Sequence, residues 1–196
     1  MENGQMGLML LGMSIFFGAH SVRIFAAPWR ERQLAKLGPI AWKGAYSLVS
    51  LLGLLLMVWG YGETRGEAEL WSPPQAMRHI AILLTLPAFV LVVAAYLPRN
   101  HLRTALGHPM LAGVKLWALA HLLANGRAGD IVLFGAFLLW SVVAFAAARR
   151  RDRTAGRPKA EGSFKGDALA LTVGLVAWAA FAMVGHMRLI GVAPLG

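Results

Sequence analysis

Long runs of apolar residues, separated by short polar stretches, dominate the pattern along this chain. An α-helix needs roughly 20 mainly apolar residues to cross the hydrocarbon core of a bilayer. None of the runs shows the alternation of apolar and polar positions that indicates a half-buried β-strand. The pattern therefore predicts an all-α, polytopic membrane helical bundle. Its six transmembrane helices are expected at 5–24, 41–61, 77–97, 109–125, 129–148 and 167–187.

The composition supports this prediction. Hydrophobic residues make up 58% of the chain and charged residues 14%, whereas about 25% of the residues in ordinary soluble domains are charged. The mean hydropathy is +0.59. We therefore expect a single domain over residues 1–196, with the lipid bilayer as its main partner. The absence of cysteine from the sequence excludes disulfides, thiolate-bound iron–sulfur clusters and thiol catalysis.

Basic residues are concentrated in every second loop between the predicted helices. The first, third and fifth loops, with their flanks, contain 14 of the 19 lysines and arginines. By the positive-inside rule these loops are cytoplasmic, so both termini are expected outside, in the periplasm. The basic cytoplasmic loop at 149–166 fixes this orientation and contacts anionic lipid, rather than binding nucleic acid. The net charge of +10 therefore requires no nucleic-acid partner.

Two histidines lie deep within predicted helices. His20 is 13 residues after Gly7, and His121 is 13 residues after His108, which places each ring about 20 Å along its helix. A polar ring in hydrocarbon is costly unless a partner uses it. Neutral imidazole binds iron, copper and zinc, and helix bundles hold haem between histidines without any cysteine. We therefore expect His20 and His121 to ligate the metal of haem b. The alternative is that each ring only forms hydrogen bonds within the bundle.

Three further residues complete the predicted cofactor site. Trp117 and Asn125 lie one turn on either side of His121, on the same helical face. Trp117 is expected to form an apolar wall, and Asn125 to orient the imidazole. Arg23 follows His20 by three residues and is placed to meet a haem propionate. Its alternative role is to extend toward the membrane surface and fix the topology.

A second pair of candidate residues begins the fourth predicted helix. His108 precedes Pro109, and proline suits the first helical turn, so His108 is expected at the N-cap. Lys115 lies nearly two turns later and shares the helical face of His108 rather than that of His121. An intramembrane lysine is a functional candidate by default. His108 and Lys115 are thus the candidate catalytic residues, with extension of the lysine to the membrane surface as its alternative role.

Several segments together resemble the NnrU family. These are FFGAHS, KGAYSLVSL, LWSPP, AAYLP and HPMLAGVKLWALAHLLANG, which lie between about Gly7 and Arg150, whereas the sixth predicted helix is similar only as a generic span. The resemblance implies one NnrU-like, multi-pass transmembrane domain in the bacterial inner (cytoplasmic) membrane. It also implies a link to nitrite and nitric oxide metabolism in denitrification, and a small hydrophobic or gaseous substrate.

The same resemblance raises two alternatives. The NnrU family is related to 15-cis-zeta-carotene isomerase, a haem b membrane enzyme whose functional histidines resemble His20, His108 and His121, which implies cis–trans isomerisation of a polyene. This chain has Ala118 where the isomerase has a cysteine, so a mechanism using that thiol cannot operate. The HP-x-L-x-G pattern is also similar to a motif of membrane methyltransferases that use S-adenosylmethionine. That reading is disfavoured because residues 149–162 contain no adjacent acidic pair.

Overall fold

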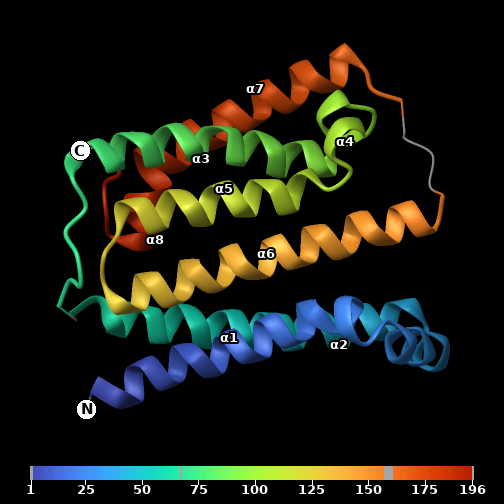
Figure 1. The fold of residues 1–196 in the computed structure, drawn as a ribbon, viewed down its shortest axis with the longest axis horizontal. Coiled ribbons are helices and arrows are strands. Elements are labelled where there is room, and N and C mark those ends of the chain that lie inside the picture. The colour runs from blue at the N-terminus through green and yellow to red at the C-terminus, as the bar shows by residue number, and fades with distance from the viewer. Residues whose placement is uncertain (1, 67, 157–160, 196) are drawn as a thin grey trace. The chain divides into compact units, whose positions relative to one another are not determined.

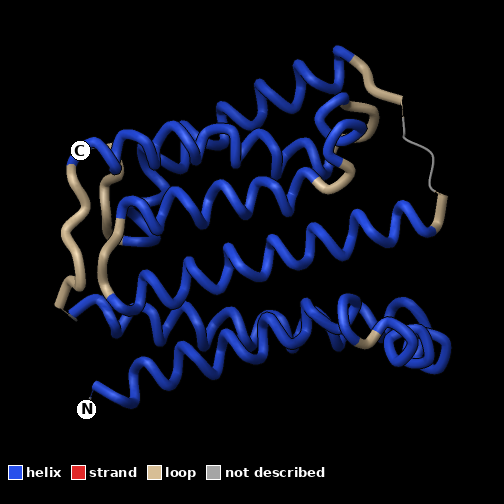
Figure 2. The backbone as a smooth tube through the Cα atoms, in the orientation of Figure 1, coloured by secondary structure: helices blue, strands red, loops and turns tan. Residues whose placement is uncertain are grey.

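Helices and their connections make up the part of the chain that the structure describes. The computed structural model describes residues 2–66, 68–156 and 161–195, with the side chains of 2–5 left out. These segments contain no strand (Figure 2), and the backbones of Glu69 and Arg127 form an isolated antiparallel bridge. The prediction of an all-α protein is confirmed.

The helices match most of the predicted spans. Within the described residues, five helical segments are long and apolar enough to cross a membrane, and α5 is a shorter apolar helix. The protein is therefore a multi-pass membrane protein, while the sixth span and the orientation of the termini stay predictions. The elements are α1 (Glu2–Phe25), α2 (Ala27–Glu63), the 3₁₀ turn η1 (Thr64–Gly66), α3 (Gln75–Tyr96), α4 (His101–Leu106), α5 (Pro109–Ala124), α6 (Ala128–Thr154), α7 (Phe164–Ala180), the π-helical turn η2 (Phe181–Gly185) and α8 (His186–Ile190).

The second helix begins much earlier than the apolar pattern predicts. Residues 27–37 are helical, and the helix is interrupted at Gly38, whose φ is +76°. Glycine favours this left-handed backbone because it has no Cβ, and Pro39 then starts the next helical stretch. The rings of Trp29 and Trp42 pack edge to face across the break, with centroids 5.8 Å apart. The predicted first loop is thus largely a short helix.

The basic segment that was predicted as a loop is also partly helical. α6 continues to Thr154, so Arg149, Arg150, Arg151 and Arg153 belong to its last turns. Arg157 and Lys159, which the sequence analysis assigned to the same loop, lie outside the described residues. Because arginine has a high helix propensity, a basic run continues a helix readily once the apolar span ends.

The chain forms two compact units, each of which is described by itself. The first unit comprises Met1–Leu70 with Arg127–Leu133, and the second comprises Trp71–Gly126 with Phe134–Gly196. In the first unit, α1 packs against α2 through glycines. A Cβ on Gly12 would lie 2.2 Å from the backbone nitrogen of Met57, and one on Gly60 would lie 2.3 Å from that of Met9. Small residues of this kind let two membrane helices approach closely.

The second unit places α3 between α5 and α7 (Figure 1). The helices approach closely at two glycines: a Cβ on Gly113 would lie 2.8 Å from the carbonyl oxygen of Ala88, and one on Gly174 would lie 2.7 Å from Cα of Val90. α6 packs on α5 through rings, with the centroids of Trp117 and Phe134 5.2 Å apart. The second unit thus has the helix order α6, α5, α3, α7.

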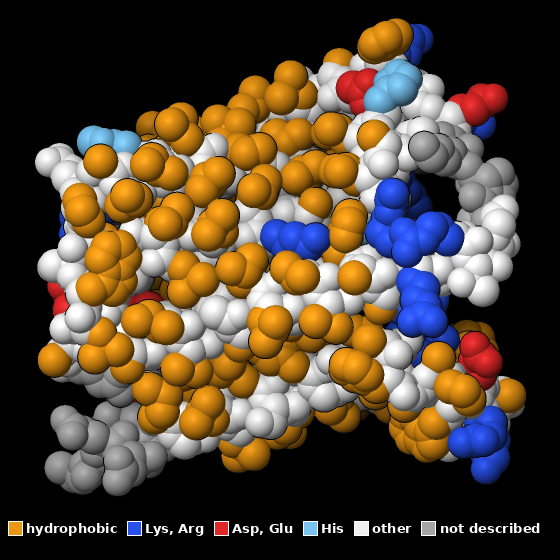
Figure 3. Space-filling view, in the orientation of Figure 1, with side chains coloured by type: hydrophobic (Ala, Val, Ile, Leu, Met, Phe, Trp, Pro, Cys, Tyr) orange, Lys and Arg blue, Asp and Glu red, His pale blue; other side chains and the backbone are white. Residues whose placement is uncertain are grey.

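Large apolar side chains are exposed along the helices. On α2, eight large apolar residues are each at least half exposed: Leu37, Ile40, Leu48, Leu51, Leu52, Leu55, Val58 and Trp59. Soluble monomers rarely expose apolar surface on this scale, whereas lipid-facing helices require it. Figure 3 shows the same apolar cover over the second unit, with lysine and arginine side chains gathered toward the end of α6. The surface therefore fits a lipid bilayer.

Candidate functional site

His121 lies in the last turn of α5, among aromatic rings. Its Nδ1–H donates a hydrogen bond of 2.8 Å to the carbonyl oxygen of Trp117. The ring centroid is 4.9 Å from that of Trp117 and 4.5 Å from that of Phe134. A carbonyl oxygen can only accept, so the neutral imidazole has its proton on Nδ1 and its lone pair on Nε2. That is the tautomer in which Nε2 can ligate a metal.

His20 repeats this arrangement in the first unit. Its Nδ1–H donates to the carbonyl oxygen of Phe16 at 2.8 Å, and its ring stacks on that of Phe16 with centroids 4.0 Å apart and 27° between the planes. Tyr46 from α2 lies 5.3 Å away, ring to ring. A Cβ on Gly18 would meet no atom within 4 Å, so open space lies beside this turn. Both predicted ligands are thus half-buried imidazoles with the same fixed tautomer.

The other predicted cofactor residues occupy different positions. Asn125 is the C-cap of α5 and donates from Nδ2 to the backbone carbonyl oxygen of His121 at 2.8 Å, which fixes the helix end next to the histidine. Arg23 is exposed in the last turn of α1. Trp117 has two roles. Its carbonyl oxygen accepts the hydrogen bond from His121, and the residue also lines an apolar cavity.

A half-open apolar cavity of about 210 Å³ lies between α3 and α5. The surface that lines it is entirely apolar. The lining residues are Ala88, Phe89, Val92, Gly113, Val114 and Trp117. A polar ligand would lose its hydrogen bonds to water here without replacement, so the cavity suits hydrocarbon. It adjoins the His121 cluster through Trp117.

His108 forms a hydrogen bond to a carboxylate that the sequence did not predict. As predicted, it is the N-cap of α5. Its Nε2 lies 2.8 Å from Oδ2 of Asp152, and both side chains are 28% exposed. Nearby, Nη1 of Arg149 donates to the carbonyl oxygen of Leu106 at 3.3 Å. Asp152 lies within a run of arginines. The sequence around it therefore indicated a charged segment but no contact with His108.

Lys115 lies over an aromatic ring of α6. Its Nζ is 3.7 Å from the ring centroid of Phe145, at which distance the ammonium is attracted by the negative face of the ring. His108 approaches the same ring edge-on, with centroids 6.4 Å apart. The structure thus brings together His108 and Lys115, the two candidate catalytic residues, around Phe145.

A buried carboxylate joins the end of α2 to the start of α6 in the first unit. Asp130 is 5% exposed; Oδ1 accepts from the hydroxyl of Tyr61 at 2.7 Å and Oδ2 from the backbone N–H of Arg127 at 3.1 Å. Thr64, which is 2% exposed, donates to the carbonyl oxygen of Tyr61 at 2.9 Å. The sequence indicated only that Asp130 lies in the fourth loop, which gives no sign of a partner 69 residues away.

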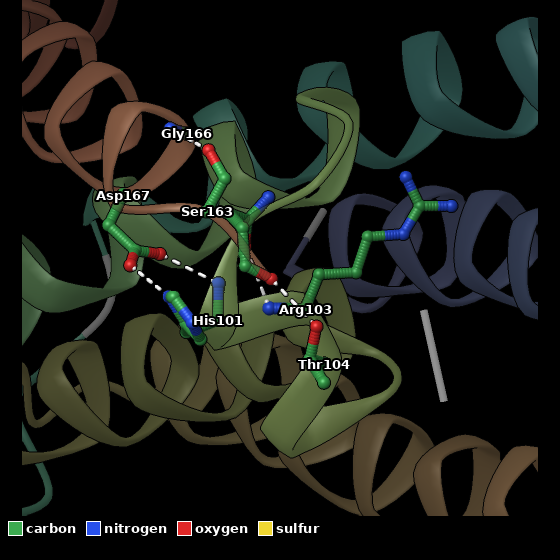
Figure 4. Close-up of polar contacts among 7 residues, drawn as sticks. His101, Arg103, Thr104, Ser163, Gly166 and Asp167 are labelled. Carbon is green, nitrogen blue, oxygen red and sulfur yellow. Dashed lines mark hydrogen bonds and ion pairs between the residues drawn. The ribbon is translucent and has the colours of Figure 1, made fainter. Parts of the chain in front are cut away.

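A further histidine fixes α4 to α7 in the second unit (Figure 4). The backbone N–H of His101 donates to Oδ1 of Asp167 at 2.7 Å, and its Nδ1 donates to Oδ2 at 2.5 Å. Asn100, 1% exposed, accepts from the backbone N–H of Arg103 and donates to the carbonyls of Ala94 and Leu97. Every polar group of the Asn100 side chain is therefore satisfied within the fold, which is typical of a structural cap.

The described residues contain no group of three or more histidine, aspartate or glutamate side chains arranged to hold a metal ion. Haem ligation by two histidines does not need such a group.

The family comparison covers almost the whole chain: the model described as NnrU protein matches residues 8–194. The chain belongs to the NnrU family. Comparison with curated proteins and with solved structures gave no match.

The match to the NnrU family confirms the predicted family and extends it. The resemblance seen in the sequence ended near Arg150, but the NnrU match continues through α7 and α8. The family match therefore includes the last helices as well. Both His20 and His121 lie within the matched residues, as does the His108–Asp152 pair.

Proposed function

We propose that this NnrU-family protein binds haem b in the bacterial inner membrane, and that His20 and His121 would hold it. We further propose that it serves redox or gas-binding chemistry in nitrite and nitric oxide metabolism. The observation that supports the haem proposal is the shared arrangement of the two histidines. Each donates Nδ1–H to the carbonyl of an aromatic residue four positions earlier, at 2.8 Å, and each packs against that residue's ring.

The chain's own residues prepare both rings for ligation. The hydrogen bond from Nδ1 to a carbonyl fixes the ring orientation and increases the basicity of Nε2. Phe16 and Trp117 cover one side of each imidazole and limit the access of water to it. Arg23 at the end of α1 supplies a guanidinium suited to a propionate. When bound, haem b would supply a one-electron redox centre.

The visible absorption spectrum tests this proposal. Protein purified from haem-replete cells is expected to show a Soret band, and His20→Ala and His121→Ala are each expected to reduce the bound haem per protein at least threefold or to shift the band. His79→Ala is the matched control, because His79 is an exposed histidine at the start of α3. A colourless wild-type preparation, or a spectrum that neither variant changes, contradicts the proposal.

One observation favours a second candidate, the haem-dependent cis–trans isomerisation of a polyene. The apolar cavity between α3 and α5 shares Trp117 with the His121 cluster, so hydrocarbon in the cavity would lie next to that cluster. Incubation of the haem-loaded protein with a cis-polyene, followed by chromatographic separation of the isomers, tests it. Val114→Phe fills the cavity and is expected to suppress conversion. An unchanged isomer ratio with wild-type protein rejects this candidate.

A further inference from the structure

Lys115 carries a charge in apolar surroundings, and no described residue supplies a counter-ion to it. It follows His108 by seven residues, which places its backbone about 10 Å further along α5. Within the described residues, no ion pair or hydrogen bond joins its ammonium group to the protein, and its contact is the ring of Phe145 at 3.7 Å. A cation–π contact offsets only part of the cost of an ammonium in hydrocarbon. An external anion would offset the rest.

Two other basic residues lie at the same end of α5 and α6. His108 approaches the ring of Phe145 edge-on, and Arg149 lies one turn after Phe145 on α6, with its guanidinium on the carbonyl of Leu106. Asp152 is the acidic member of this group and pairs with Nε2 of His108. Asp152 therefore orients the histidine, and the lysine and arginine leave the group with a net positive charge.

An apolar strip continues from this basic group toward the middle of the helices. Leu119 is one turn beyond Lys115 on α5 and 38% exposed, and Val142 is one turn before Phe145 on α6 and 46% exposed. α5 and α6 run antiparallel here, because His108 at the start of α5 pairs with Asp152 near the end of α6. Both exposed residues therefore lie deeper in the bilayer than the basic group.

We propose that Lys115, Arg149 and His108 bind the phosphate of an anionic phospholipid, whose hydrocarbon chain lies along Leu119 and Val142. A phosphate oxyanion provides the counter-charge that the described residues do not supply to Lys115. The apolar strip next to the basic group favours a lipid over a free phosphate ion, because only a lipid covers both surfaces. This site is independent of the proposed haem site, since none of its residues belongs to the His20 or His121 clusters.

Lipid retention measured by native mass spectrometry tests the site. Wild-type protein is expected to retain dioleoyl phosphatidylglycerol at least tenfold more than dioleoyl phosphatidylcholine. Lys115→Met keeps the length of the side chain but removes its charge, and is expected to reduce phosphatidylglycerol retention about tenfold. Lys115→Arg keeps the charge and is expected to retain phosphatidylglycerol as wild type does. Arg153→Gln removes an exposed charge from α6, the helix that carries Arg149, and is expected to change retention less than twofold.

Competition separates the two sources of phosphate. Dodecyl phosphate is expected to displace phosphatidylglycerol, and inorganic phosphate at the same concentration is not. Displacement by inorganic phosphate overturns the lipid assignment.

Equal retention of phosphatidylglycerol by wild type and Lys115→Met overturns the site, as does equal retention of phosphatidylglycerol and phosphatidylcholine by wild type. Phe145→Leu removes the ring but keeps an apolar side chain, and is expected to weaken retention without unfolding the protein. The Soret band is expected to be unchanged in Lys115→Met, so this proposal and the haem proposal fail independently.

Discussion

Replacing Gly60 by alanine is expected to destabilise the packing of α1 on α2 by about 1–3 kcal/mol, the usual cost of overpacking. The added Cβ would lie 2.3 Å from the backbone nitrogen of Met9 and 2.7 Å from its Cα. These are backbone atoms of a helix, so relief requires the whole of α1 to shift rather than one side chain to rotate. Met9 is fully buried at this point. Unfolding in mixed detergent micelles, followed by circular dichroism, measures the loss.

Gly44→Ala is the matched control on the same helix. A Cβ on Gly44 would meet no atom within 4 Å, so the substitution adds no clash. Alanine is the better helix former by roughly 0.5–1 kcal/mol, so this variant is expected to be as stable as wild type or slightly more stable. Of the two alanine substitutions, only Gly60→Ala is thus expected to destabilise the protein. A similar loss of stability in both variants would show that close approach is not the reason for glycine at position 60.

Replacing Asp130 by alanine is expected to destabilise the first unit by about 2–4 kcal/mol, from a lost helix cap and an unsatisfied buried hydroxyl. The carboxylate accepts from the backbone N–H of Arg127 just before α6 and from the hydroxyl of Tyr61 at the end of α2. Because Asp130 is only 5% exposed, water cannot easily replace it. The measurement is the same unfolding transition, compared with wild type.

Two conservative variants separate the contributions of Asp130. Asp130→Asn keeps one side-chain oxygen as an acceptor, so it is expected to lose about half of the stability that alanine loses. Tyr61→Phe removes only the hydroxyl and leaves the bond to Arg127 in place. It is expected to cost less than Asp130→Ala, because the carboxylate still caps the start of α6. If Tyr61→Phe and Asp130→Ala were equally destabilising, the bond to Arg127 would contribute nothing.

The spans could be predicted from the sequence because the length of an apolar run is a local property. The sequence predicted a helix at 109–125 and the structure has α5 at Pro109–Ala124; the third helix was predicted at 77–97 and is Gln75–Tyr96. The N-cap position of His108 was also predicted, since it depends only on the proline that follows. The helix at 27–37 was missed because its residues are mixed in polarity and precede a glycine and a proline.

The partners of the candidate residues could not be predicted, because they are distant in the sequence. Asp152 is 44 residues from His108, and Asp130 is 69 residues from Tyr61. Which side chains meet depends on the rotation of each helix about its axis and on its register against the next helix. Glycines such as Gly113 set that register by close backbone approach.

The sequence by itself determined that this is a helical membrane protein of the NnrU family and which histidines lie within its apolar spans. Hydrophobic run length and short motifs are enough for both conclusions, because each depends on neighbours along the chain. Only the tertiary structure decided that His108 pairs with Asp152, and that Lys115 shares Phe145 with His108. Those contacts join different helices, and packing between helices places them.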